Sequence, residues 1–271
     1  MRTIVDPATL QADMLARRTR GERIGFVPTM GFLHEGHLSL MEKARSMCDH
    51  LVVSIYVNPL QFGPTEDLDR YPSDPEGDAN KCTSKGVDTL FLPPNLYDPN
   101  HSTTVSVEGL STGLCGANRP GHFDGVTTVV ARLFGLVQPS IAVFGEKDYQ
   151  QLAVIRRMVR DLGMPIDIVG GSLIRDVDGL ALSSRNTYLT PDLRQRALTL
   201  HQALYAMRDA ETKQASERLA TGRAILDVDK LDYLEIVDPE SLIPVEEITG
   251  PARALVAGWI GKTRLIDNVA I

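Results

Sequence analysis

The sequence predicts an α/β protein with two domains, and two patterns lead to this prediction. In residues 1–176, short apolar runs rich in β-branched residues alternate with segments of helical spacing, as in the βαβ units of a parallel sheet. Beyond residue 177, a long helical segment precedes three runs that alternate like antiparallel strands. We therefore expect a Rossmann-like parallel-sheet domain at 1–176 and a smaller α+β domain at 177–271 that closes over the ligand site of the first.

The composition suits an enzyme better than a nucleic-acid-binding or membrane protein. The chain has 271 residues and a net charge of −7, so no basic surface for nucleic acid is expected. No run approaches the roughly 18 apolar residues of a membrane span. The three cysteines, Cys48, Cys82 and Cys115, form no C-x-x-C pair, and no signal peptide is recognisable, so we expect a cytoplasmic protein.

The first predicted elements form a helix followed by a βαβ unit. Leu10, Met14 and Leu15 share one face of a helix at 7–20, which Gly21 ends. The apolar run 24–27 predicts a buried strand, and Leu38, Met41 and Ala44 have helical spacing within 37–45. The run 49–57 is apolar and β-branched throughout, which is typical of a central parallel strand.

Two histidines, His34 and His37, lie at the turn between the first strand and its helix. The free N–H groups and positive dipole end of a helix N-terminus suit a phosphate, and Gly31 and Gly36 allow a ligand to come close to the backbone. Two imidazoles three residues apart can both donate hydrogen bonds to that anion, or act as cations if charged. The alternatives are a metal pair, although H-E-G-H lacks the H-E-x-x-H spacing, and two exposed histidines at a helix cap.

Asn58 and Gln61 follow the second strand, where ligands of a parallel sheet bind. Each amide could instead only cap backbone groups. The acidic, proline-rich residues 64–80 predict a flap that leads into a helix, with its carboxylates exposed to solvent. The flap is followed by predicted strands at 87–92 and 105–107.

Residues 126–137 predict a helix that is apolar nearly all round, and therefore buried either in the core or in a subunit interface. Strands are predicted at 141–144 and 166–169. Between them, Gly145-Glu-Lys-Asp-Tyr-Gln-Gln151 repeats the arrangement of strand, glycine, polar cluster and helix.

Three polar side chains of this second cluster are candidate ligand-binding groups. Lys147 can follow a phosphate as a mobile point charge, Asp148 can accept hydrogen bonds from ribose hydroxyls, and Gln151 can face the pocket. The alternative is a helix cap with an exposed lysine.

The segment Leu182-Ser-Ser-Arg185 places two hydroxyls beside a guanidinium, a combination that binds polyphosphate, although the serines could also act as caps. Beyond it, residues 191–225 are predicted to be helical, and 231–237, 253–260 and 263–269 to be strands. The three groups of donors indicate a site for ATP with Mg²⁺, in which developing charge on phosphorus is stabilised.

Six motifs along the whole chain resemble the pantoate–β-alanine ligase family of the HxGH nucleotidyltransferase group, which is related to class I aminoacyl-tRNA synthetases. They are Pro28-Thr-Met-Gly-Phe-Leu-His-Glu-Gly-His-Leu-Ser-Leu, Val53-Ser-Ile-Tyr-Val-Asn-Pro-Leu-Gln-Phe, Arg119-Pro-Gly-His-Phe, Phe144-Gly-Glu-Lys-Asp-Tyr-Gln-Gln, Arg175-Asp-Val-Asp-Gly-Leu-Ala-Leu-Ser-Ser-Arg-Asn and Gly261-Lys-Thr-Arg-Leu-Ile-Asp-Asn.

The resemblance implies a reaction in two steps. The carboxylate of pantoate attacks the α-phosphate of ATP, and pantoyl adenylate and pyrophosphate form. The amine of β-alanine then displaces AMP, and pantothenate forms. The resemblance also implies a homodimer whose partners are small-molecule substrates, with neither nucleic acid nor membrane involved.

The resemblance also assigns site residues by position. His37, His34, Lys147 and Arg185 are the expected catalytic residues, Gln61 and Gln151 are expected to bind pantoate, and Gln61 and Asn58 to bind β-alanine. The expected ATP-binding residues are Met30, Gly31, Phe32, Leu33, His34, Glu35, Gly36, His37, Gly145, Glu146, Lys147, Asp148, Ile174, Leu182, Ser183, Ser184 and Arg185.

Three residues depart from the usual pattern of the family, namely Phe32 in place of Ala, Ser73 in place of Arg and Leu182 in place of Met. None of them removes a charged group from the centre of the site. Two other functions remain as alternatives: another HxGH nucleotidylyltransferase, which would form no AMP, and a non-catalytic nucleotide-binding protein.

Overall fold

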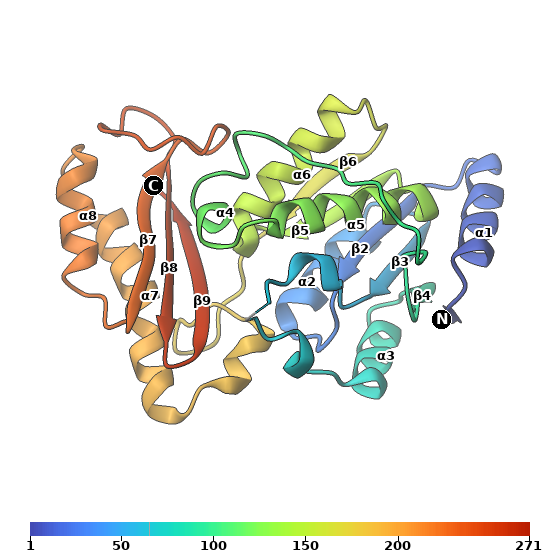
Figure 1. Ribbon diagram of the computed structural model, residues 1–271, viewed down its shortest axis with the longest axis horizontal. Helices are drawn as coiled ribbons and strands as arrows, with labels where there is room; N and C mark the ends of the chain where they lie inside the picture. The colour runs from blue at the N-terminus through green and yellow to red at the C-terminus, as the bar shows by residue number, and fades with distance from the viewer. Residues whose placement is uncertain (65) are drawn as a thin grey trace.

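The structure of the chain is a computed structural model that describes residues 1–64 and 66–271. It contains two β-sheets in different parts of the molecule. The N-terminal sheet and its helices lie on the right of Figure 1, and the C-terminal sheet with its two helices lies on the left. The predicted α/β fold class, with a smaller α+β part after a parallel sheet, is confirmed.

The N-terminal sheet is parallel at every pairing, in the order β1-β4-β3-β2-β5-β6. Its strands are β1 (Arg2–Ile4), β2 (Ile24–Thr29), β3 (His50–Ile55), β4 (Thr89–Phe91), β5 (Ile141–Gly145) and β6 (Asp167–Gly171). The helices of this part are α1 (Pro7–Thr19), α2 (Glu35–Arg45), α3 (Pro75–Ser84), α4 (Cys115–Asn118), α5 (His122–Val137) and α6 (Tyr149–Asp161), with 3₁₀ turns η1 (Pro59–Gln61), η2 (Leu68–Arg70) and η3 (Glu146–Asp148).

The strand order reverses at β2, which is paired with β3 on one side and with β5 on the other. The chain therefore leaves β2 and β5 in opposite directions, and a crevice opens beyond their carboxyl ends. Ligands of open parallel sheets bind at such a switch point. The turn after β2 carries the two histidines, and the turn after β5 carries Lys147.

Helix α5 is buried within the chain itself. Val129, Leu133 and Phe134 belong to a core with the sheet and with α1 and α6, and the Phe134 ring packs edge-on against Phe26 of β2. Of the two sequence-based interpretations of 126–137, burial in the core is therefore the one observed. A second core, which includes Leu38 of α2, covers the other face of the sheet.

The C-terminal part consists of an antiparallel sheet backed by two helices. Its strands are β7 (Lys230–Val237), β8 (Arg253–Ile260) and β9 (Thr263–Ala270), and its helices are α7 (Pro191–Asp209) and α8 (Ala215–Arg223), preceded by the 3₁₀ turn η4 (Ser184–Tyr188). These elements enclose a separate core. In the part of the chain that the structure describes, no helix is both long enough and apolar enough to span a bilayer.

Two predictions about individual elements need correction, and one element was missed. Residues 105–107 form no strand, because threonine hydroxyls of α5 take their backbone groups: the Val105 N–H donates to Thr128 Oγ1 over 3.0 Å, and its carbonyl accepts from Thr127. The predicted helix 191–225 is two helices, separated at residues 210–214. The edge strand β1 was not predicted, because three residues are too few for a periodic pattern.

The turn after β3 lies directly against α5. A Cβ atom at Gly125 would lie 2.3 Å from the Leu60 carbonyl oxygen and 2.6 Å from the Gln61 nitrogen. The Asn58 side chain also donates to the Gly125 carbonyl over 3.0 Å. Only glycine therefore allows α5 to hold the turn that carries Asn58 and Gln61.

We expect Gly125→Ala to lower the free energy of unfolding by about 2 kcal/mol, because backbone must move to admit the methyl group. If Gln61 binds a ligand as expected from the sequence, the moved turn should also raise the KM for that ligand. Urea unfolding and steady-state kinetics measure the two effects. Gly135→Ala, in the same helix with open space around its Cβ position, is the matched control and should not destabilise the protein. Equal stability and equal KM for Gly125→Ala and the wild type would contradict this account.

Candidate active site

Two adjoining cavities lie where the N-terminal sheet meets the C-terminal part. The His-turn cavity has a volume of about 220 Å³ and includes His34, His37 and Gln61 in its wall. The flap cavity has a volume of about 520 Å³ and includes Glu66, Asp67 and residues of β8 and β9. Both cavities are lined by Arg119, His122, Lys147, Asp148, Gln151, Ser183 and Arg185, so they form one continuous cleft.

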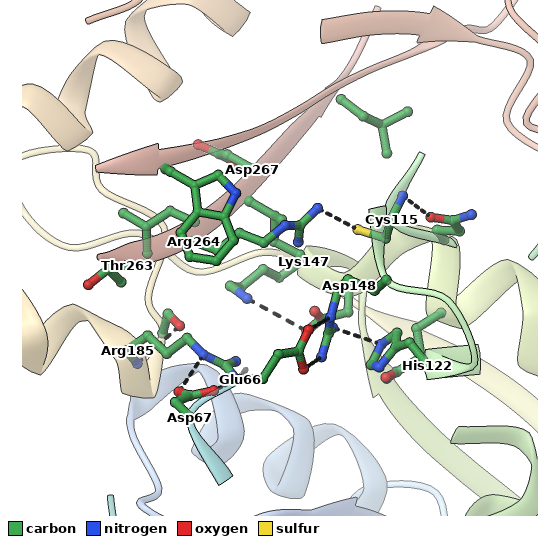
Figure 2. A pocket seen from close by; sticks show the side chains of 18 of the residues that line it. Glu66, Asp67, Cys115, His122, Lys147, Asp148, Arg185, Thr263, Arg264 and Asp267 are labelled. Carbon is green, nitrogen blue, oxygen red and sulfur yellow. Dashed lines mark hydrogen bonds and ion pairs between the residues drawn. The ribbon is translucent and has the colours of Figure 1, made fainter. Parts of the chain in front are cut away.

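Figure 2 shows how the flap cavity is built. Arg185 and Asp67 face each other on one side, and His122 lies on the other side. Lys147 and Asp148 lie between them, and Arg264 of β9 approaches from the C-terminal sheet. The cavity is therefore walled by both parts of the chain.

The structure brings most of the expected site residues together. Those that line the His-turn cavity are Met30, His34, Gly36, His37, Asn58, Gln61, Gly145, Lys147, Asp148, Gln151, Ile174, Leu182, Ser183, Ser184 and Arg185. The other expected residues line neither cavity. Leu33 is buried in the core beneath the turn, Glu35 is exposed on α2, and Glu146 lies 3.4 Å from Arg253.

Gly31 and Phe32, which also line neither cavity, shape the His turn through their backbone. Both have positive φ angles, 88° and 49°. The N–H groups of Phe32 and Leu33 donate to the two carboxylate oxygens of Asp78 over 2.8 and 2.7 Å. Lys81, one turn further along α3, donates to the Leu33 carbonyl over 2.9 Å.

The expectation of solvent-exposed carboxylates in 64–80 is therefore wrong for several residues. Asp78 is 1% exposed, because its carboxylate serves the N–H groups of the His turn. Glu66 and Asp67 point into the flap cavity and pair with Arg119 and Arg185. Thr65 of the predicted flap lies outside the described residues.

The two histidines are oriented by backbone hydrogen bonds. His34 Nδ1 accepts from the Gly36 N–H over 3.2 Å, and His37 Nδ1 accepts from the His34 N–H over 3.3 Å. With Nδ1 as the acceptor, each neutral ring carries its proton on Nε2. The ring centroids are 4.1 Å apart, so the two rings lie against each other.

Both imidazoles are neutral at pH 7. Burial, and then the charge of Lys147, lower the pKa of His34 to about 4. Burial, and then His34 and Lys147, lower the pKa of His37 well below its ordinary value. The histidines therefore serve as neutral Nε2–H donors beside the N-terminus of α2 rather than as cations.

The turn after β5 places Lys147 in the wall of the same cavity as the two histidines. Its nearest carboxylate is that of Asp148, whose Oδ2 lies 3.7 Å from Nζ. Asn268 of β9 donates to the carbonyls of Glu146 and Lys147 over 3.0 and 2.9 Å, so the C-terminal sheet anchors this turn. Sequence reasoning assigned no role to Asn268, although the motif that begins at Gly261 contains it.

Arg185 is paired within the protein. Its Nε and Nη2 donate to the Asp67 carboxylate over 2.9 and 2.7 Å, and its guanidinium lies 5.6 Å from the centre of the Tyr71 ring. Ser183 caps the turn by accepting from the Arg185 N–H over 3.3 Å, and Ser184 donates to the Phe32 carbonyl over 3.2 Å. Ser183 therefore acts as a cap, as the capping alternative proposed, whereas Ser184 ties this turn to the His turn.

Arg119 and His122 are site residues to which sequence reasoning assigned no role. His122 Nδ1 donates to the Gln61 carbonyl over 2.8 Å, and its Nε2 accepts from Arg119 over 3.0 Å. Burial, and then Arg119, lower the pKa of His122 to about 4. Since both ring nitrogens are engaged, His122 holds Gln61 in place.

The amide side chains beneath the cleft differ in how firmly they are held. Asn58 is 1% exposed and is bonded to the Gly125 carbonyl and, over 2.9 Å, to Tyr97 Oη. The Gln61 side chain makes a longer contact of 3.2 Å with Asn58 and one of 3.0 Å with Met30 Sδ. Gln61 is the more available of the two for a ligand.

In the described residues, no group of three or more histidine, cysteine or acidic side chains is arranged to hold a metal ion. Both Nδ1 atoms of the His34–His37 pair accept backbone N–H groups, so Nε2 of each neutral ring carries the proton. Neither ring then has a free nitrogen lone pair with which to bind zinc. The cleft therefore combines an array of neutral and cationic donors with carboxylates that are mostly paired to arginine. Such a donor array binds and stabilises a phosphate or another multiply charged anion.

Comparison with known proteins identifies the family. The family model described as pantoate-beta-alanine ligase matches residues 2–270. The chain belongs to this family. It is 51% identical, over 99% of its length and 98% of the relative's, to the pantothenate synthetase of Desulfatibacillum aliphaticivorans.

Solved structures of similar proteins agree with this assignment. A crystal structure of pantothenate synthetase from Thermus thermophilus has a TM-score of 0.94 and 50% identity, with 99% of each chain covered. Pantoate-beta-alanine ligase from Francisella tularensis, crystallised with β,γ-ATP and β-alanine, has a TM-score of 0.82 and 32% identity, with 99% of this chain and 97% of that chain covered.

The buried neutral histidines make stability depend on pH. The ordinary pKa of 6.5 applies in the unfolded chain, and burial lowers the pKa of His34 to about 4 in the folded one. Between these pH values the unfolded chain binds more protons, so the free energy of unfolding falls as the pH drops from 6.5 to 4. We expect His34→Asn to reduce this fall by up to about 3 kcal/mol, measured by urea unfolding at several pH values. Parallel pH profiles for the variant and the wild type would refute the buried neutral state of His34.

Proposed function

We propose that the chain catalyses the ATP-dependent condensation of (R)-pantoate with β-alanine to pantothenate, through pantoyl adenylate and with release of AMP and pyrophosphate. One observation carries this proposal: the donor array at the sheet's switch point lies on the motifs that the pantoate-beta-alanine ligase family shares with this chain. Another nucleotidylyltransferase or a non-catalytic nucleotide-binding protein gains no support from the relatives that the chain matches.

In the first step, a carboxylate oxygen of pantoate attacks the α-phosphorus of ATP, and the bond from that phosphorus to the bridging oxygen breaks. Pyrophosphate takes the bonding electrons. His34 and His37 donate Nε2–H groups to the α-phosphate oxygens, and Lys147 adds a positive charge on the neighbouring side. Pantoate is already a carboxylate at neutral pH, so this step requires no general base.

In the second step, the neutral amine of β-alanine attacks the acyl carbon of the adenylate. The bond from this carbon to the phosphate oxygen breaks with its electrons going to AMP, and the nitrogen releases one proton to solvent. We assign Gln61 and Gln151 to pantoate, and Gln61 with Asn58 to β-alanine. The apolar Val126, Val129 and Val130 line the same cavity, which suits the two methyl groups of pantoate. The similar Francisella protein was crystallised with β-alanine as well as β,γ-ATP, which supports binding of both ligands by this chain.

The nucleotide is assigned to the segments around the switch point. Met30 to His37 form the phosphate turn, with Gly31, Phe32, Leu33 and Glu35 shaping it. Gly145 to Asp148 would carry the ribose and phosphates, Ile174 would meet adenine through its backbone, and Leu182 to Arg185 would hold the polyphosphate. The closeness of these segments in the cleft supports the assignment.

We propose that Mg²⁺ enters the cleft as Mg-ATP, and that protein ligands alone do not bind it. Mg²⁺ is commonly held by substrate phosphates and one or two carboxylates. Asp148 is the carboxylate of the cleft that fits this task, because its side chain is 48% exposed and its nearest cation, Lys147, is 3.7 Å away. When bound, the ion would neutralise phosphate charge.

The domain boundary, the homodimer and the cytoplasmic location are proposals of the same kind. The division at 176/177 is supported by the parallel sheet, which ends at Gly171, and by Leu180, which belongs to the C-terminal core. Three free cysteines suit a reducing compartment. The homodimer rests on family resemblance, and light scattering in solution would test it.

Product analysis tests the proposed function. The protein is mixed with Mg-ATP and pantoate, with and without β-alanine. AMP and pantothenate should accumulate only when β-alanine is present, and leaving out Mg²⁺ should stop both. Release of pyrophosphate with no AMP under any condition would instead indicate a nucleotidylyltransferase.

We expect His37→Ala to slow adenylate formation by about 10²- to 10³-fold, as when an oxyanion-type donor is lost. Rapid-quench analysis of pantoyl adenylate in a single turnover measures this step directly. His201→Ala, on α7 and outside both cavities, is the control and should react at the wild-type rate. An unchanged single-turnover rate for His37→Ala would rule out the role assigned here.

A further inference from the structure

Two neighbouring carboxylates of the flap cavity are paired with two arginines of its wall. Glu66 accepts from Arg119 Nε and Nη2, both over 2.6 Å. Asp67 accepts from Arg185 Nε and Nη2 over 2.9 and 2.7 Å. Figure 2 shows both carboxylates inside the cavity, among the cationic side chains.

The Asp67–Arg185 pair has the geometry of a bidentate ligand complex. Two parallel N–H···O bonds to one carboxylate are also the pattern by which arginine binds phosphate. The side chains of Arg185 and Asp67 are only 26% and 16% exposed, so solvent screens the pair less than an exposed surface pair. Burial disfavours the charge on Asp67, but its bonds to Arg185 outweigh this effect and hold the pKa of that carboxyl below its usual range.

Arg185 keeps other contacts that do not depend on Asp67. Its guanidinium lies over the Tyr71 ring, and its backbone N–H is capped by Ser183. A ligand that took the place of Asp67 would therefore find Arg185 already directed into the cleft. Arg185 also lines both cavities, so it stands between the His turn and the flap cavity.

We propose that Asp67 is a built-in competitor of the nucleotide's phosphates, which holds Arg185 until ATP displaces it. The inference rests on the proposed function, since it takes the ligand of this cleft to be ATP. In the ligand-free protein Asp67 neutralises a partly buried guanidinium. When ATP binds, a phosphate oxygen takes over the donors of Arg185, and Asp67 turns away.

This exchange makes ATP binding weaker than the donor array alone would allow. Part of the interaction between phosphate and Arg185 is offset by the bidentate pair that must break. Removing the charge of Asp67 therefore tightens the binding of any ligand whose phosphates reach Arg185. A supporting role for Asp67, in which it orients Arg185 in the complex, predicts the opposite sign.

The test compares Asp67→Asn, which removes the charge but keeps the shape, with the wild type. We expect the Kd for Mg-ATP, measured by titration calorimetry without pantoate, to fall about fivefold or more, which is within the usual range of coupling between two ligands. The Kd for inorganic pyrophosphate should fall as well. The Kd for adenosine, which has no phosphate, should not change. In the full reaction, KM for ATP should fall by a similar factor.

Two further variants separate competition from general effects. Asp69→Asn removes the same charge from an exposed position of the same turn that lines neither cavity, and it should leave every Kd unchanged. Asp67→Glu keeps the charge and should bind ATP less tightly than Asp67→Asn. Thermal unfolding shows whether each variant is folded.

The outcomes distinguish this inference from the proposed function. If the wild type makes pantothenate but Asp67→Asn binds ATP equally or more weakly, competition by Asp67 is wrong and the ligase function stands. If Asp67→Asn and Asp69→Asn tighten ATP binding equally, the effect is long-range charge and the inference also fails. If the wild type neither binds ATP nor forms pantothenate, both proposals fail.

Discussion

The geometry of the His turn depends on the hydrogen bonds that it makes to the buried carboxylate of Asp78. This carboxylate accepts the N–H groups of Phe32 and Leu33, and these bonds hold Phe32 at positive φ two residues before His34. A buried carboxylate is stable only when its oxygens find donors, so turn and helix α3 stabilise each other. The predicted flap is tied to the site through α3, because this helix begins at Pro75, inside residues 64–80, and carries Asp78.

The electrostatic character of the cleft follows from this construction. Because the turn is buried against α3, His34 and His37 are shielded from solvent, which lowers the pKa of both side chains. The positive charge of Lys147 lowers both pKa values further, so the imidazoles stay neutral. Positive charge in the cleft is carried by Lys147, Arg119 and Arg185, and the two histidines supply oriented neutral donors. Oriented donors of this kind require little reorganisation when charge develops on phosphorus, whereas a pair of imidazolium rings 4.1 Å apart would repel each other.

The fold and the centre of the site were predictable because their signals are local. An apolar run such as 24–27 predicts its strand, and the glycines around the histidines predict the turn, without any knowledge of distant contacts. The acidic flap was misinterpreted because its meaning is non-local: Asp67 meets Arg185, which is 118 residues away in the sequence. In the sequence, a carboxylate that is paired at such distance looks the same as one in solvent. The hydrogen bonds by which threonine hydroxyls take the place of a strand partner at Val105 are non-local in the same way.

The paired arginines explain how an acidic chain can maintain a cationic cleft without a ligand. Several partly buried guanidinium groups in one cavity would repel one another and destabilise the closed arrangement of the two sheets. Glu66 and Asp67 supply the counter-charge to Arg119 and Arg185. Under the proposed displacement of Asp67 by ATP, the stability of the protein and its affinity for ATP are opposed at the Arg185 guanidinium. The balance between them depends on how firmly each arginine is held by its other contacts, such as Tyr71 at Arg185 and His122 at Arg119.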